Sequence, residues 1–247
     1  MRTYIFVFTL LIIGIGVWWY AARSPEDVSE LPLQENEAAT VATSSPAVAE
    51  GESFGAPLEE RTPVAFGTYS IDTSESVFGW AGKKPFIDGY VNSGTIMLQE
   101  GMFALTAENG LRGNVVLDMN TITVGLTAAK PGGESKLEEH LKGDAFFKVA
   151  EYPTATFTIT DSEQTDDFHY GIVGDLTMLG TTQEIAFDAE AFATENGDTA
   201  TILAQFTIDR TRWGITVGSG SFFSDLGDNL ISDDILLDLL LVTRRYE

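Results

Sequence analysis

Three segments in the second half of the chain alternate between apolar and polar side chains. Residues 155–160, 184–191 and 201–209 all show this period of two. Such alternation places one face of a strand in a core and the other in water, as in antiparallel sheets. Turn-forming Gly, Asn and Asp residues separate the segments, so many short strands follow one another at regular spacing. The pattern predicts an all-β antiparallel barrel or sandwich.

One helix is expected to interrupt the strands. Ser135 and Glu138 have the spacing of a capping box, in which each side chain bonds a free amide of the first turn. Leu137 and Leu141 follow at helical spacing, and Gly143 is placed to end the helix. We expect this short amphipathic helix to lie across an open barrel end or a sheet face.

The N-terminus carries a different pattern. Residues 4–22 form an uncharged run with Arg2 before it and Trp18, Trp19 and Tyr20 at its far end. A helix of this length spans roughly 28 Å, close to a hydrocarbon core. A cleaved signal peptide is the alternative, although Tyr20 or Trp19 would then occupy a position that prefers a small residue. We expect residues 1–23 to be an uncleaved single-pass anchor in the cell membrane, with the rest of the chain extracytoplasmic, periplasmic or extracellular.

Residues 24–65 have neither helical nor strand periodicity. They hold five of the eight prolines, many acidic residues and Phe54 as their one aromatic residue. This composition buries too little apolar surface to offset the entropy of ordering the chain, so the segment is predicted to be a disordered linker. The folded domain is then residues 66–247.

Composition excludes several classes of function. The net charge is −23, which argues against a nucleic-acid partner because phosphate binding needs clustered Lys and Arg. Cysteine is absent, which removes disulfides, thiolate nucleophiles and cysteine-ligated metals. His140 and His169 are the two candidates for a neutral-pH base, and neither has a metal-binding or nucleophile motif around it. We expect no enzyme activity, no metal and no cofactor.

Several motifs in the folded part resemble those of the YceI-like family. They are HLKGDAFFKV at 140–149, YPTATF at 152–157, GDLTMLGTT at 174–182, and IDR with WGI at 208–210 and 213–215. The opening YSID at 69–72 and the closing ISDDI at 231–235 match in order and spacing. The resemblance covers residues 66–245. Family members commonly carry a His-Ser pair where this chain has Glu75-Ser76, and a subset has a histidine element where this chain has 92–94.

The resemblance implies a lipocalin-like antiparallel barrel of about eight strands that binds a polyisoprenoid or other long-chain lipid in an apolar lumen. Burying each methylene of such a chain contributes about 0.8 kcal/mol. The candidate lining residues are bulky aromatic side chains that either lie on the inward face of a strand or lie near the helix. They are Trp80, Phe146, Phe147, Phe157, Phe187, Phe206 and Trp213.

Alternatives to this interpretation stay open at the level of sequence. The aromatic side chains on the alternating strands can instead fill a dry core, leaving an envelope interaction protein with an acidic binding surface. Phe146 and Phe147 can form either a lid over the entrance or a plug that fixes the helix. Arg210 is expected to form a structural ion pair with a carboxylate, such as a neighbour of Asp209 or Asp72, rather than to contact a lipid headgroup.

Overall fold

The structure is a computed structural model that describes residues 61–108, 110–127, 132–193 and 197–246. The predicted membrane anchor and most of the predicted linker lie outside these residues. Within the described ranges, no helix is long and apolar enough to cross a membrane.

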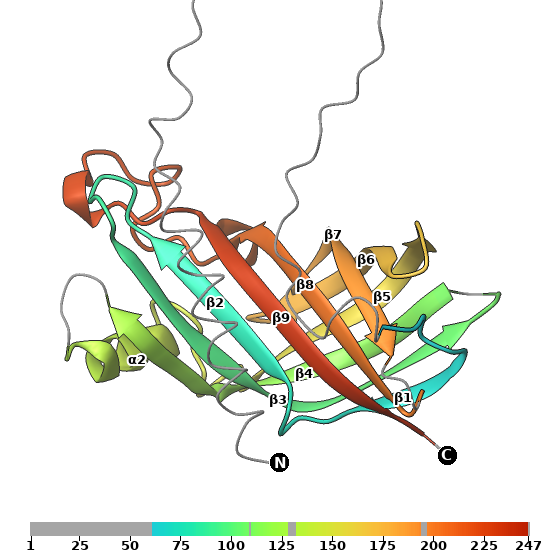
Figure 1. Ribbon diagram of the computed structural model, residues 1–247. Coiled ribbons are helices and arrows are strands. Elements are labelled where there is room, and N and C mark those ends of the chain that lie inside the picture. Colours follow the sequence, from blue (N-terminus) through green and yellow to red (C-terminus); the bar gives the residue numbers. More distant parts are fainter. Residues whose placement is uncertain (1–60, 109, 128–131, 194–196, 247) are drawn as a thin grey trace, which may run out of the picture.

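Nine antiparallel strands form one closed sheet (Figure 1). They are β1 (Gly67–Ile71), β2 (Val77–Lys83), β3 (Val91–Thr106), β4 (Gly110–Thr127), β5 (Thr154–Gln164), β6 (His169–Met178), β7 (Thr181–Ala193), β8 (Thr199–Asp209) and β9 (Asp234–Arg245). β1 and β2 both pair with β3 on one side and β9 on the other, so together they fill one position in the barrel. The result is a barrel with eight strand positions, as the resemblance to the YceI-like family implied.

The break between β1 and β2 is held by hydrogen bonds to β9. Ser76 Oγ accepts from Val242 N at 2.9 Å, and Val242 O accepts from Asp72 N at 2.8 Å. Ser76 is buried, whereas Glu75 forms an ion pair with Arg244 at 2.9 Å. The position where the family commonly has His-Ser therefore serves a structural role here.

The alternating segments lie in β5, β7 and β8, and their apolar side chains face the barrel interior. Ala155, Ile185, Ala189, Ile202 and Ala204 are all less than a tenth exposed. On β7, Phe192 is one position out of step with the inward-facing residues, so its side chain points to the outside of the barrel. It is buried on the outer face beneath Arg61, whose guanidinium carbon lies 4.2 Å from the ring centroid.

The predicted helix is present as α2 (Glu134–Lys142), and it ends at Gly143 as expected. The predicted capping box was wrong, because the N-cap is Gly133 and no side chain caps the helix. Glu138 instead accepts from the backbone N–H of Val124 at 2.9 Å, and Glu134 accepts from Thr127 Oγ1 at 3.0 Å. The carboxylates therefore bind α2 to β4, where the β3–β4 ladder contains register shifts that free backbone groups.

Residues 61–65, at the end of the predicted linker, pack against the barrel. Thr62 bridges Ala193 at the end of β7, and Val64 is buried in the core. Tyr69 Oη donates to Ala65 O at 2.8 Å.

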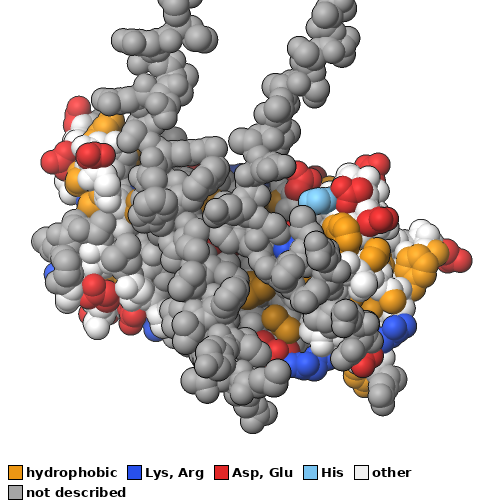
Figure 2. All heavy atoms as spheres, viewed as in Figure 1, with side chains coloured by type: hydrophobic (Ala, Val, Ile, Leu, Met, Phe, Trp, Pro, Cys, Tyr) orange, Lys and Arg blue, Asp and Glu red, His pale blue; other side chains and the backbone are white. Residues whose placement is uncertain are grey.

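Two short helical turns follow β8, namely η3 (Arg210–Trp213) and η4 (Gly227–Asn229). Figure 1 shows that α2, the β2–β3 connection and the segment between β8 and β9 gather at one end of the barrel, whereas β1 lies at the other. Figure 2 shows acidic side chains on the coloured parts of this face, toward both sides of the view.

Candidate ligand-binding site

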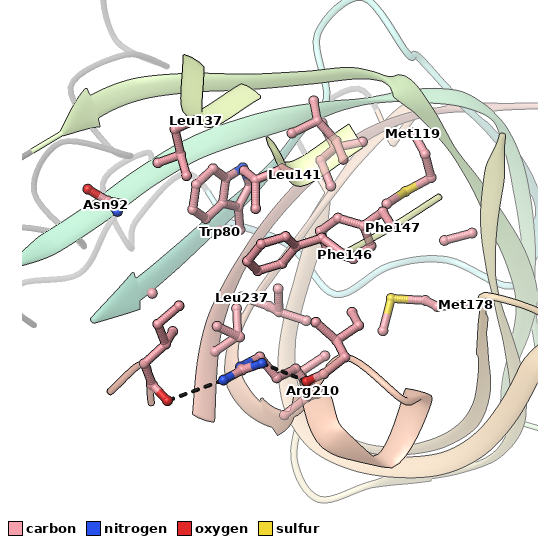
Figure 3. Close-up of a pocket in the computed structure, with 18 of the residues that line it drawn as sticks. Trp80, Asn92, Met119, Leu137, Leu141, Phe146, Phe147, Met178, Arg210 and Leu237 are labelled. Carbon is pink, nitrogen blue, oxygen red and sulfur yellow. Dashed lines mark hydrogen bonds between the residues drawn. The ribbon is translucent and has the colours of Figure 1, made fainter. Parts of the chain in front are cut away.

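A cavity of about 390 Å³ lies inside the barrel at the end covered by α2. Pockets for small organic ligands typically occupy roughly 300–1,000 Å³, so the space suits a ligand rather than a few waters. Its walls are mainly apolar and come from most strands and from α2 (Figure 3). They include Phe78, Trp80, Ile96, Leu117, Met119, Ile122, Leu137, Leu141, Phe146, Phe147, Leu176, Met178, Ile208 and Leu237.

Three of the residues predicted to contact a ligand line this cavity, namely Trp80, Phe146 and Phe147. Trp80 points inward from β2, and Figure 3 shows its ring beside those of the two phenylalanines. The phenylalanines follow α2 in a turn in which Phe147 N donates to Leu141 O at 3.0 Å. Both are half-buried and pack against the core.

Three further predicted residues, Phe157, Phe187 and Phe206, form a separate aromatic group deeper in the barrel. The rings of Phe187 and Phe206 are stacked, with centroids 4.1 Å apart and planes 6° apart. Phe157 and Phe187 are tilted at 43°, with centroids 5.5 Å apart. Phe157 and Phe187 line a second cavity of about 40 Å³.

The seventh predicted residue, Trp213, is placed in closed core. Its side chain is nearly inaccessible, and its indole N–H donates to Leu176 O at 2.9 Å. It packs with Leu176, Ile185, Ile208 and Leu237 and is not among the residues that line either cavity. Leu176, Ile208 and Leu237 lie between Trp213 and the larger cavity. Trp213 therefore packs against the outer side of the cavity wall and does not face the cavity itself.

Sequence reasoning missed much of the wall. On β9 the run Ile235-Leu236-Leu237 is continuously apolar, so parity cannot identify the inward side chains. Leu237 lines the cavity, whereas Leu236 packs with Ala81 and Val91 in another cluster. Met119 and Met178, whose flexible thioethers adapt to irregular shapes, also line it. The apolar spacing of Leu137 and Leu141 did signal that one face of α2 is buried.

Arg210 lines one side of the cavity and forms the structural ion pair expected of it, although not with Asp72. It pairs with Asp233 at 3.4 Å, whereas Asp72 pairs with Arg244. The guanidinium also donates to the carbonyls of Ser232, Ile215 and Ile231 at 2.9, 2.6 and 3.2 Å. Burial lowers the pKa of Arg210, and the nearby carboxylates of Asp233 and Asp209 oppose this effect. An arginine remains charged under such conditions, so it holds the β8–β9 segment in place.

Two buried polar atoms in the cavity wall have no hydrogen-bond partner in the described part of the chain. They are the indole nitrogen of Trp80, a donor, and Oδ1 of Asn92, an acceptor. Unsatisfied buried groups of this kind are unusual in folded proteins and call for an explanation. Both atoms are closed off from the open space of the cavity in this structure, so a ligand hydroxyl reaches either one only after neighbouring side chains move.

The two histidines are in different settings. His140 lies on α2 and contributes to the cavity wall, whereas His169 lies outside it and contacts the carboxylate of Asp166 at 2.8 Å. Among the described residues, no group of three or more His, Cys, Asp or Glu side chains is placed to hold a metal.

Comparison with protein families agrees with the geometry of the barrel. The sequence profile of the YceI-like domain matches residues 69–243, which is more than half of the chain. This chain belongs to the YceI-like family. The matched range runs from within β1 to near the end of β9, so it includes all or part of every strand and every residue that lines the cavity.

Two curated relatives match parts of the chain. A UPF0312 protein of Pectobacterium atrosepticum is 32% identical over 91 residues, or 37% of this chain and 44% of that protein. A UPF0312 protein of Yersinia pestis is 29% identical over 77 residues, or 31% of this chain and 35% of that protein. The chain thus spans less than half the length of these curated relatives.

Two solved structures share the fold of this chain. BcnA of Burkholderia cenocepacia superimposes with a TM-score of 0.53 and 17% identity, covering 70% of this chain and 98% of BcnA. A polyisoprenoid binding domain from Saccharophagus degradans gives a TM-score of 0.54 and 14% identity, covering 74% of this chain and 100% of that domain. At these identities the likeness shows a common fold.

Proposed function

We propose that this protein is a non-catalytic lipid-binding protein that holds a polyisoprenoid or similar amphiphile in the barrel lumen. The observation that carries the proposal is the apolar cavity of about 390 Å³ inside the closed barrel. A dry core would pack without a space of this size, because protein interiors are close-packed. The polyisoprenoid binding domain of Saccharophagus degradans, which has the same fold, supports the choice of ligand class.

The energetics favour a long apolar chain. Each five-carbon isoprene unit that leaves water contributes roughly 4 kcal/mol before ordering costs, at about 0.8 kcal/mol per carbon. Several units are therefore enough to overcome the loss of freedom on binding. Trp80 and Asn92 each hold an unpartnered polar atom in the cavity wall, and a side-chain movement on binding would present that donor or acceptor to a hydroxyl at the head of the chain.

The uncharged run at residues 4–22 supports a location at the membrane. A single-pass anchor would keep the barrel close to the bilayer, where long-chain lipids are found, and the acidic linker would separate the two. Membrane pelleting and N-terminal sequencing test this part of the proposal. A mature protein that begins near residue 23 would overturn the anchor.

Filling the cavity tests the proposed site directly. Met178 lines the cavity, so Met178→Trp places an indole in the space that the lipid would occupy. Met97 on β3 is exposed, so Met97→Trp adds the same ring outside the barrel. We expect Met178→Trp to lower the amount of lipid that is extracted from the purified protein, and Met97→Trp to leave it unchanged. Equal lipid content in two folded variants would contradict the site.

A further inference from the structure

The interior of the barrel is divided along its length into two cavities. On β4, Leu117 lines the larger cavity and Val115, two residues earlier, lines the smaller one. On β9, Leu237 lines the larger cavity and Leu239 the smaller one. On each of these strands, two inward-facing residues that are two positions apart line different cavities. A boundary between the cavities therefore crosses the barrel between residues 115 and 117 of β4 and between residues 237 and 239 of β9.

The stacked phenylalanines lie at that boundary. Phe157 is paired with Leu176 across β5 and β6, and Phe206 is paired with Leu237 across β8 and β9. Leu176 and Leu237 line the larger cavity, whereas Phe157 and Phe187 line the smaller one. The three rings come from three different strands and meet inside the barrel on the smaller cavity's side of Leu176 and Leu237, which line the larger cavity.

Gly174 on β6 fixes the position of one of these rings. A Cβ at this residue would lie 2.5 Å from Cζ of Phe157, which is closer than real Cβ atoms approach a neighbour. The absence of a side chain therefore lets the Phe157 ring lie directly against the β6 backbone. Stacking of Phe187 on Phe206 at 4.1 Å then completes a continuous aromatic layer.

We propose that Phe157, Phe187 and Phe206, which lie behind Leu176 and Leu237, back the end wall of the lipid site and so set the longest chain that the protein accepts. The smaller cavity lies beyond these rings, and the rings prevent a bound chain from entering it. This inference rests on the proposed function and adds a property to it, because a lipid site without an end wall would accept chains that reach into both spaces.

The test measures chain-length preference in a single mixture. The full chain is incubated in detergent micelles with a graded series of all-trans prenyl alcohols from farnesol to solanesol. Native mass spectrometry then identifies the bound chain by its added mass. We expect the wild-type protein to prefer one length, and Phe187→Leu and Phe206→Leu to prefer chains longer by at least one isoprene unit, because the smaller cavity becomes accessible.

Phe192→Leu is the matched control. Phe192 lies on the same strand as Phe187 but on the outer face beneath Arg61, so this variant loses the same ring without opening the lumen. It is expected to keep the wild-type preference. Folded Phe187→Leu and Phe206→Leu proteins that bind with an unchanged preference would overturn the end wall and leave the proposed function intact. Absence of any bound prenyl alcohol in the folded wild-type protein would overturn both.

Discussion

The guanidinium of Arg210 lies 3.4 Å from the carboxylate of Asp233, and only 4% of the Arg210 side chain is exposed. This pair connects the end of β8 to the start of β9 beside the cavity, and three carbonyls accept further hydrogen bonds from the same guanidinium. The cavity wall at this end of the barrel therefore depends on one buried cation.

Replacing Arg210 with methionine should be strongly destabilising. The variant keeps an apolar side chain but leaves Asp233 without its cation and three carbonyls without their donor. Breaking a buried pair in this way typically costs about 3–5 kcal/mol. Urea unfolding measures the loss. Arg112→Met is the control, because its ion pair with Asp161 is exposed and should contribute at most about 1 kcal/mol. Similar losses for the two variants would contradict the role of Arg210.

The same pair predicts how stability responds to acid. Burial raises the pKa of Asp233, but hydrogen bonds from Ser219 and Ser221 and the charge of Arg210 outweigh it, so the pKa falls below the ordinary value of 3.8. The ionised carboxylate therefore stabilises the folded state above pH 3.8, and this contribution is lost as the pH falls through the lower folded-state pKa.

Asp233→Asn removes this contribution and should flatten the acid limb of a plot of unfolding free energy against pH. Asp72 has a pKa that is also lowered, chiefly by a hydrogen bond from Ser74, so some acid dependence should remain in the variant. An acid limb identical to that of the wild-type protein would show that Asp233 does not titrate as described.

Glu138 is predicted to hold α2 over the cavity. Its carboxylate accepts from the backbone N–H of Val124, so Glu138→Ala leaves that donor without its partner, at a cost of roughly 1–3 kcal/mol. We expect faster amide hydrogen exchange throughout α2. Glu139, the next residue, is exposed and serves as the control, because Glu139→Ala should leave exchange unchanged. Equal rates of amide hydrogen exchange in α2 of the two variants would show that Glu138 does not hold α2 in place.

Trp80 is predicted to orient the head of the lipid. Trp80→Phe retains an aromatic wall but removes the unpartnered indole N–H. A neutral hydrogen bond contributes about 1 kcal/mol, so affinity for a prenyl alcohol should fall roughly five-fold. Affinity for the hydrocarbon of equal length should change less, because the hydrocarbon has no hydroxyl. Competition binding measures both ligands, and an equal loss for the two would contradict the hydrogen bond.

Strands with one solvent-exposed face could be predicted from the sequence, because the alternation of apolar and polar residues shows directly which side chains face the barrel interior. This succeeded for Ala155 and Ile202, but it gave no answer for the continuous apolar run of β9. Trp213 shows a second limit. An inward aromatic residue on a barrel either lines a cavity or packs behind its wall, and the pattern is the same in both cases.

Long-range pairing was harder to predict than local structure. Gly143 ends α2 through its immediate neighbours, so its role was visible in the sequence. Glu138 bonds Val124 instead of completing a capping box, because a distortion of β4 presents a backbone donor that no local motif encodes. The division of the lumen likewise depends on Phe157, Phe187 and Phe206 meeting from three strands.

The central claim is that the lumen holds a lipid, and native mass spectrometry of the gently purified full chain tests it most directly. We predict a stoichiometric added mass of several hundred daltons that extracts as a prenyl or other long-chain lipid. A clean mass for the unliganded protein, with no uptake of added prenyl alcohols by the folded chain, would contradict the claim.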